Sequence, residues 1–166
     1  MRKKKQGFTL VELMVTITVA AILLTIGVPS LISMYEGFRT NSNVDKIHGI
    51  MVFARNQAIN YGATVNICPY ASGSACGTNW NSGIKVYIGT TKVLRSIDSF
   101  NSTDKVKGPE KIASNKNDAY ITFSPDGLSS GGTIVYCPSG KTSGSKSVNI
   151  LTSGVIKLGI DDLGCS

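Results

Sequence analysis

The chain has 166 residues, 16% charged and 42% hydrophobic, a composition that indicates a folded protein and excludes an intrinsically disordered one. The net charge of +7 overstates how basic the folded part is, because Arg2, Lys3, Lys4 and Lys5 supply four of the 17 basic residues. The other 13 basic and 10 acidic residues leave +3, which by itself does not indicate nucleic-acid binding. The length suits one modest domain after an N-terminal segment.

The N-terminus is a basic tip followed by an apolar segment, Phe8 to Ile32, that contains one formal charge, Glu12. At about 25 residues this segment can span a membrane as a helix, and it is longer than the apolar core of an ordinary signal peptide. The basic tip predicts a single-pass membrane protein whose N-terminus is in the cytoplasm and whose residues after Ile32 are on the other side of the membrane. A carboxylate at the centre of a bilayer costs about 2.5–3.5 kcal/mol, so we interpret Glu12 as a functional residue.

The stretch KKKQGFTLVELMVTITVAAIL resembles the class III signal of type IV prepilins and type II secretion pseudopilins. In that family a prepilin peptidase in the membrane cuts after the glycine, here Gly7, and methylates the new first residue, here Phe8. The resemblance implies that residues 1–7 are a leader that is removed, whereas residues 8–32 stay in the mature protein as a transmembrane and filament-core helix among inner-membrane lipids. It also implies that Glu12 is an assembly contact between subunits.

Residues 33–62 are predicted to continue the helix as an amphipathic segment. Pro29, which matches the family's helix-kinking proline, should cause a kink or a melted turn at its own position in the helix. Apolar residues at alternating spacings of three and four form one stripe that should pack on a globular head: Val44, Ile47, Met51, Ala54, Ala58 and Tyr61. Three further residues lie off the stripe and either face a neighbouring subunit or pack locally: Val52, Phe53 and Ile59. Gly62 suits a left-handed helix cap.

The remaining residues, 63–166, are rich in Gly, Ser, Thr and Asn, which favours short strands and turns. Alternation of apolar and polar residues between turn signals predicts strands at 63–68, 83–89, 92–98, 119–124, 133–138, 147–152 and 154–159. The polar, lysine-rich stretch 99–117 is interpreted as an exposed loop. The fold class is therefore α+β, with a long helix over about 8–61 packed on an all-β head.

Four cysteines follow the membrane segment, and an even number in an exported domain predicts two disulfides. Of the three pairings we favour Cys68–Cys76, which encloses a short loop of turn-forming residues, together with Cys137–Cys165, which ties down the end of the chain. We expect no metal and no cofactor, because no CxxC pair occurs and the single histidine, His48, is far from the cysteines in sequence.

The head carries a second resemblance, to minor pilins of the GspH/FimT type, which include FimU-like pilins and the GspH minor pseudopilin. It rests on FARNQAINYGATVNICP, on Trp80 and Gly83, on ITFSPDG followed by GTIVYC, and on SVNILTSGVIKL, and covers about residues 1–160. It implies a type IV pilin fold whose head is made of two packed antiparallel sheets. It further implies that the chain helps to initiate type IV pilus assembly in a priming or tip complex with other minor and major pilins.

DNA binding is an alternative function. Some FimT-type pilins bind DNA for natural transformation through a C-terminal GRxR motif and neighbouring basic residues. The corresponding segment here, residues 154–157, reads GVIK and keeps only the glycine and one basic residue. An arginine lost from such a site removes a bidentate phosphate contact that lysine does not replace. The candidate DNA contacts are Lys141, Lys146 and Lys157, and their interpretation as solvated surface charges is favoured.

The second alternative is a GspH-type minor pseudopilin of a type II secretion system, which would place the mature chain in a periplasmic pseudopilus instead of an extracellular pilus. Enzymatic activity is not expected. His48 and the pair Asp161–Asp162 have no accompanying nucleophile or base in a catalytic pattern.

Overall fold

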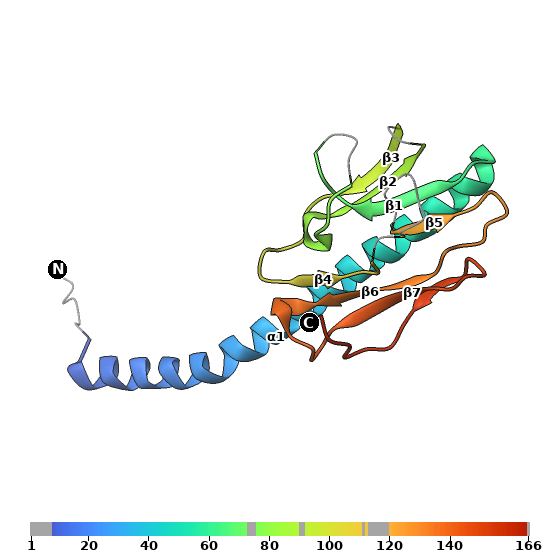
Figure 1. Cartoon of the computed structure of the whole chain (residues 1–166). Helices are drawn as coiled ribbons and strands as arrows, with labels where there is room; N and C mark the ends of the chain where they lie inside the picture. The colour runs from blue at the N-terminus through green and yellow to red at the C-terminus, as the bar shows by residue number, and fades with distance from the viewer. Residues whose placement is uncertain (1–7, 73–75, 90–91, 111, 113–119, 166) are drawn as a thin grey trace. The chain divides into compact units, whose positions relative to one another are not determined.

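The structure is a computed structural model that describes residues 8–72, 76–89, 92–110, 112 and 120–165 (Figure 1). The described residues form one α-helix, two short 3-10 helices and eight β-strands. They divide into two units, of which the first ends at Glu36 and the second is Gly37–Ser166. The second unit, here called the head, includes the C-terminal part of the helix and both β-sheets. Gly7 and the rest of the expected leader lie outside the described residues.

Helix α1 (Leu10–Tyr61) is 52 residues long and continues without interruption through Pro29. The expected melted turn at that proline is therefore wrong, while the kink remains a prediction. Threonine hydroxyls in the apolar part donate to carbonyls one turn back, as Thr16 does to Leu13 O and Thr25 to Ile22 O, each at 2.8 Å. Their polar groups are therefore satisfied within the helix, which suits an apolar environment.

One sheet of the head contains four antiparallel strands in the order β3-β2-β1-β5. These strands are β1 (Val65–Pro69), β2 (Ile84–Ile88), β3 (Lys92–Ile97) and β5 (Ile121–Phe123). A 3-10 helix, η1 (Trp80–Ser82), precedes β2. Because β1 and β2 lie at the centre of the sheet, nine of their ten residues are buried, whereas the edge strand β3 is largely exposed.

The second sheet also has four antiparallel strands, in the order β4-β6-β7-β8. They are β4 (Lys105–Lys107), β6 (Gly132–Cys137), β7 (Lys146–Ile150) and β8 (Ile156–Leu158), and η2 (Pro138–Gly140) follows β6. The expected head of two antiparallel sheets is confirmed. The expectation that 99–117 is only a loop is wrong at β4. That strand has a single inward apolar residue, Val106, between two exposed lysines, too short a pattern to read from sequence.

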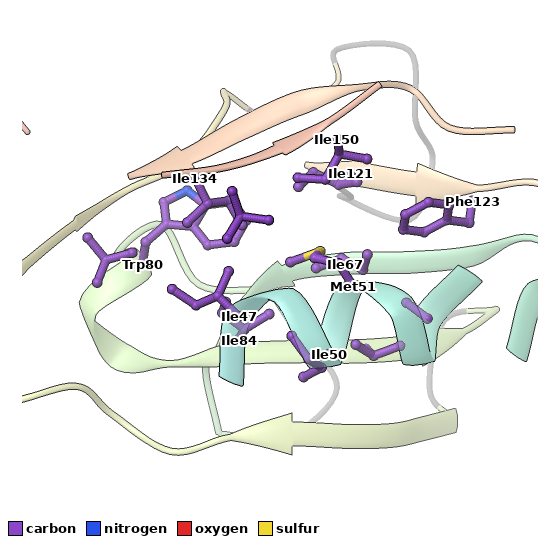
Figure 2. Packing of buried hydrophobic residues seen from close by; sticks show 14 of the residues in the cluster. Ile47, Ile50, Met51, Ile67, Trp80, Ile84, Ile121, Phe123, Ile134 and Ile150 are labelled. Carbon is purple, nitrogen blue, oxygen red and sulfur yellow. The ribbon is translucent and has the colours of Figure 1, made fainter. Parts of the chain in front are cut away.

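Helix α1 and both sheets contribute to one hydrophobic core, in which Ile47 and Met51 lie with Ile67 of β1 and Ile134 of β6 (Figure 2). Burial confirms five members of the predicted helical stripe: Val44, Ile47, Met51, Ala54 and Ala58. The prediction that the sixth member, Tyr61, is buried is wrong, because this residue is 52% exposed at the end of the helix. Ile50, which the stripe did not include, is buried.

The residues off the stripe have different environments. Phe53 is partly buried against the core, and the guanidinium of Arg95 lies 5.1 Å from the centre of its ring. Ile59 is 48% exposed. Local packing within the head therefore accounts for Phe53, while Ile59 keeps a large exposed apolar surface.

Candidate assembly interface

The first turn of α1 contains the candidate assembly residue Glu12 close to the candidate processing residue Phe8. Thr9 precedes the helix, and its hydroxyl oxygen accepts a hydrogen bond from the Glu12 backbone N–H at 3.2 Å. The pair Thr9 and Glu12 has the spacing of a capping box, in which both residues satisfy amides that the helix start leaves unpaired. Sequence reasoning missed this role of Thr9, although the threonine and glutamate spaced by three residues are its signal.

The Glu12 side chain is exposed, as is Phe8 at 78%. A carboxylate in the first turn is stabilised by the positive end of the helix dipole, typically by about 0.3–1 kcal/mol. Helix α1 is long and apolar enough to cross a membrane by length and composition, and its most apolar window is entirely exposed. Burial among the described residues therefore does not account for the apolar composition of this half of the helix.

A second site brings together three of the motifs that suggested a pilin head. Arg55, from the FAR segment of α1, donates from Nε to the carbonyl oxygen of Gly127 in the FSPDG turn at 3.1 Å. Gly154, in the turn between β7 and β8, has φ of +80°, and a Cβ added there would lie 1.8 Å from the same carbonyl oxygen. Only glycine tolerates this approach and this backbone conformation. The three motifs therefore join α1, the turn after β5 and the β7–β8 turn at one point.

The FSPDG turn is closed by its own hydrogen bonds. The Ser124 carbonyl accepts from the Gly127 N–H, and the Ser124 N–H donates to the Leu128 carbonyl, both at 2.9 Å. The Ser124 hydroxyl donates to the Asp126 carboxylate, and this bond lowers the pKa of Asp126. The turn thus holds Gly127 in a left-handed conformation, with φ of +79°, where its carbonyl faces Arg55.

A buried carboxylate, Asp104, ties the helix to the second sheet near the start of the head. Its side chain is fully buried and accepts from Arg39 Nη2 at 2.7 Å, from the Ser139 backbone N–H at 2.8 Å, and from the Tyr136 hydroxyl. Asn43, one helical turn after Arg39, donates to the Tyr136 hydroxyl oxygen at 2.7 Å. The buried charge is therefore paired and hydrogen-bonded, as a carboxylate in an apolar interior must be.

This Asp104 cluster changes the acidity of Tyr136. Burial, together with the hydrogen bond to the Asp104 carboxylate, raises the pKa of Tyr136 to about 12. Both causes disfavour a phenolate, the first because a charge is poorly solvated in the interior and the second because it would face another anion. The sequence did not reveal this cluster, since Asp104 falls in the stretch expected to be an exposed loop.

Both expected disulfides are present in the structure, Cys68–Cys76 with Cα atoms 5.7 Å apart and Cys137–Cys165 with Cα atoms 6.2 Å apart. The second attaches the C-terminal tail to β6. The Ser147 hydroxyl, which donates to the Ile160 carbonyl at 2.7 Å, holds the same tail to β7. The tail is therefore fixed both covalently and by hydrogen bonds.

The candidate DNA contacts do not come together on one face. Lys157 of β8 pairs with Asn149 of β7, whereas Lys146 falls on the same face of β7 as the buried Val148. Lys141 follows η2, outside the strands. The glycine of the GVIK segment is occupied in the contact with Gly127 described above. Lys157 and Lys146 are thus on opposite faces of the sheet.

The residues considered for catalysis lie on different elements. His48 is half-buried on α1, while Asp161 and Asp162 are exposed near the C-terminus. Over the described ranges of the chain, no group of three or more His, Cys, Asp and Glu residues is placed to hold a metal ion.

Comparison with known proteins identifies the family. The family model described as Type II transport protein GspH matches residues 43–154, and the prokaryotic N-terminal methylation motif matches residues 2–28. Among solved structures, the chain is similar to the type IV minor pilin FimU of Pseudomonas aeruginosa, with a TM-score of 0.55 and 20% identity over 72% of this chain and 92% of that chain.

It is also similar to the minor pseudopilin EpsH from the type II secretion system of Vibrio cholerae, with a TM-score of 0.56 and 8% identity over 74% of this chain and 94% of that chain. No curated protein sequence matches the chain at a significant level. At these identities the structural similarities establish the fold, while the family match spans more than half of the chain. The chain therefore belongs to the GspH family, and it is a minor pilin or minor pseudopilin of the GspH/FimT type.

Proposed function

We propose that this protein is a minor pilin that helps to initiate assembly of a type IV pilus as part of a priming or tip complex. Prepilin peptidase removes residues 1–7 and methylates Phe8, and the mature chain then associates with other minor and major pilins. The observation that carries the proposal is the exposed carboxylate of Glu12 in the first turn of an otherwise apolar helix. Stabilisation by the helix dipole, about 0.3–1 kcal/mol, is smaller than the cost of about 2.5–3.5 kcal/mol for a carboxylate at the centre of a bilayer, so a contact with a partner better explains this charge.

The assembly step follows from electrostatics in lipid. Cleavage after Gly7 creates a positively charged amine at Phe8, and the helix presents the Glu12 carboxylate one turn away. An unpaired charge in the membrane is costly, whereas a pair formed between neighbouring subunits is tolerated and fixes their register. Ala20 and Ala21 are small exposed residues on the same helix, so they allow close approach of a neighbouring helix.

The proposed topology places the basic tip in the cytoplasm and the head in the periplasm before the chain enters a filament. Two features support it: the lysines that precede the apolar segment, and the two disulfides of the head. Cytoplasmic loops next to membrane helices are enriched in basic residues, and disulfides persist in oxidising compartments such as the periplasm.

The test replaces Glu12 by glutamine, which keeps the size and removes the charge. We expect normal membrane insertion and leader cleavage, with at least about tenfold less incorporation into complexes with partner pilins, a loss of about 1.4 kcal/mol or more. Thr25→Val, an equally small change on the same helix, is the control and should assemble normally. Undiminished co-purification of the Glu12→Gln chain with partner pilins would contradict the proposal.

The match to the GspH family model and the similarity to EpsH favour a second candidate function, that of a minor pseudopilin in a type II secretion system. Deleting the chain in its native host separates the two. Loss of surface pili supports the pilus function, and loss of secreted proteins with pili retained supports the secretion function. DNA uptake is not proposed, because Lys146 and Lys157 lie on opposite faces of their sheet.

A further inference from the structure

The head contains a groove of about 430 Å³ between α1 and the end of β3. Both walls belong to the head unit. The helix provides Asn43, Lys46, Gly49 and Ile50, and the strand and the residues after it provide Arg95 and Asp98 among others. Of these, Lys46, Gly49, Arg95 and Asp98 are exposed, so the groove is open to an approaching partner.

Strand β3 offers a free sheet edge beside this groove. It is six residues long, and it pairs with β2 on one side only. Among the residues that the structure describes, no strand pairs with its other side. The backbone N–H and C=O groups on such an edge are ready to pair with another extended chain, and edge pairing is a common mode of peptide recognition.

The second observation concerns Gly49 in the groove wall, a position at which the fold of this chain does not require a glycine. A glycine inside a helix costs about 1 kcal/mol relative to alanine. A Cβ built on Gly49 meets nothing within 4 Å, so no neighbouring group in this chain excludes a side chain. The bare helix surface widens the groove, and the space it leaves is available to an atom of another chain.

The charges around the groove indicate the chemistry of that chain. Lys46 and Arg95 form no salt bridge with any described residue, and the groove has one carboxylate, Asp98. Two cations of β3 lie over aromatic rings of α1. Arg95 lies over Phe53, and the Lys92 ammonium is 4.8 Å from the centre of the Tyr61 ring. Within the groove wall, the two cations Lys46 and Arg95 outnumber the one carboxylate, Asp98, so the wall carries a formal charge of +1 (two positive charges minus one negative).

We propose that this groove receives an extended segment with acidic side chains from a neighbouring pilin subunit, and that the segment pairs with the free edge of β3. The inference rests on the proposed function, because it takes the partner from the filament that the chain helps to build. The backbone of the segment bonds to β3, its carboxylates approach Lys46 and Arg95, and its body passes over Gly49.

The test uses the full-length chain in cells that produce its pilin system. A photo-cross-linker, p-benzoylphenylalanine, replaces Ser99, an exposed residue of the groove wall. Mass spectrometry of the cross-linked product should identify a segment from the head of a different pilin that carries Asp or Glu side chains. Cross-links to a transmembrane helix, to this chain alone or to a small molecule would overturn the proposal, as would the absence of a product.

Substitutions in the groove provide the matched controls. Gly49→Gln fills the groove without a clash inside the chain and should reduce the cross-link at Ser99 by about tenfold, equivalent to about 1.4 kcal/mol of binding. Gly37→Gln makes the same change at another open position of α1 outside the groove, and it should leave the cross-link unchanged. Lys46→Glu should weaken the cross-link through charge repulsion. Equal yields from the Gly49 and Gly37 variants would overturn the proposal.

The two proposals fail in different ways. A strain without this chain that still makes normal pili would contradict the priming function, even if the groove cross-links to a pilin. Loss of pili in that strain, combined with a groove that cross-links to no acidic segment, would contradict the docking site alone.

Discussion

Replacing Asp104 by alanine should lower the free energy of unfolding of the head by about 3–5 kcal/mol, the usual cost of removing one partner of a buried ion pair. The carboxylate is fully buried and accepts from Arg39, Tyr136 and the backbone of Ser139. Without it the Arg39 guanidinium, at 16% side-chain exposure, loses this ion pair, and the Tyr136 hydroxyl loses the carboxylate that accepts its proton. Because small domains are stable by only about 5–15 kcal/mol, a large part of the head's stability is at stake.

Urea unfolding of residues 37–166, followed by circular dichroism, measures this loss. For an m-value of about 2 kcal/mol per molar, a 4 kcal/mol loss lowers the midpoint by about 2 M. Asp98→Ala, which removes an exposed carboxylate, is the control and should shift the midpoint little. Combining Asp104→Ala with Arg39→Ala should cost less than the sum of the two single changes, because each substitution removes the same ion pair. A loss below about 1 kcal/mol for Asp104→Ala, or strict additivity, would refute the reasoning.

Three further predictions concern the stability of the head. Gly154→Ala should lower the free energy of unfolding by at least about 2 kcal/mol, because φ at this position is positive and the added Cβ would overlap a backbone carbonyl. Gly62→Ala, where φ is positive but the space is open, should lower it by about 1 kcal/mol. Equal urea midpoints for the two variants would contradict this. Cys137→Ser should lower the free energy of unfolding by about 3.6 kcal/mol, the chain-entropy value for a loop whose ends are 28 residues apart. Chemical reduction of the Cys137–Cys165 bond opens the same loop, so it should lower the free energy of unfolding by the same chain-entropy value. The free energy of unfolding should fall as pH rises from about 10 to 12, because Tyr136 loses its proton at a lower pH in the unfolded chain than in the folded one. The loss is at most about 2.7 kcal/mol. Tyr136→Phe should flatten the dependence of stability on pH over this range.

Sequence patterns predicted the parts of the fold in which each residue's environment follows from its spacing along an element. The stripe that includes Ile47 and Met51 was correct because a helix buries one face and repeats every 3.6 residues. Tyr61 did not follow the pattern because it is the last residue of the helix, so no further helical turn packs beside it and covers it. Strand β4 was missed for a related reason, since a strand with one inward apolar residue has no period to detect.

The contacts between elements distant in sequence could not be predicted in this way. Asp104 and Arg39 are 65 residues apart, and nothing in the polar stretch around Asp104 distinguishes it from a solvated turn residue. Its role depends on which sheet face covers the helix, and that is a property of the tertiary structure. The cap that Thr9 forms on the Glu12 backbone N–H is different, because it is local and its signal was present in the sequence.

The convergence of Arg55, Gly127 and Gly154 bears on where function lies in this head. All three residues belong to segments on which the resemblance to the GspH/FimT pilins rests. Their contacts with one another use the Arg55 Nε, the Gly127 carbonyl and the space that a Gly154 side chain would fill. Groups that are already occupied in holding the head together are poor candidates for recognising a partner. Partner recognition should therefore depend on groups that the fold leaves open, the Glu12 carboxylate and the groove around Gly49.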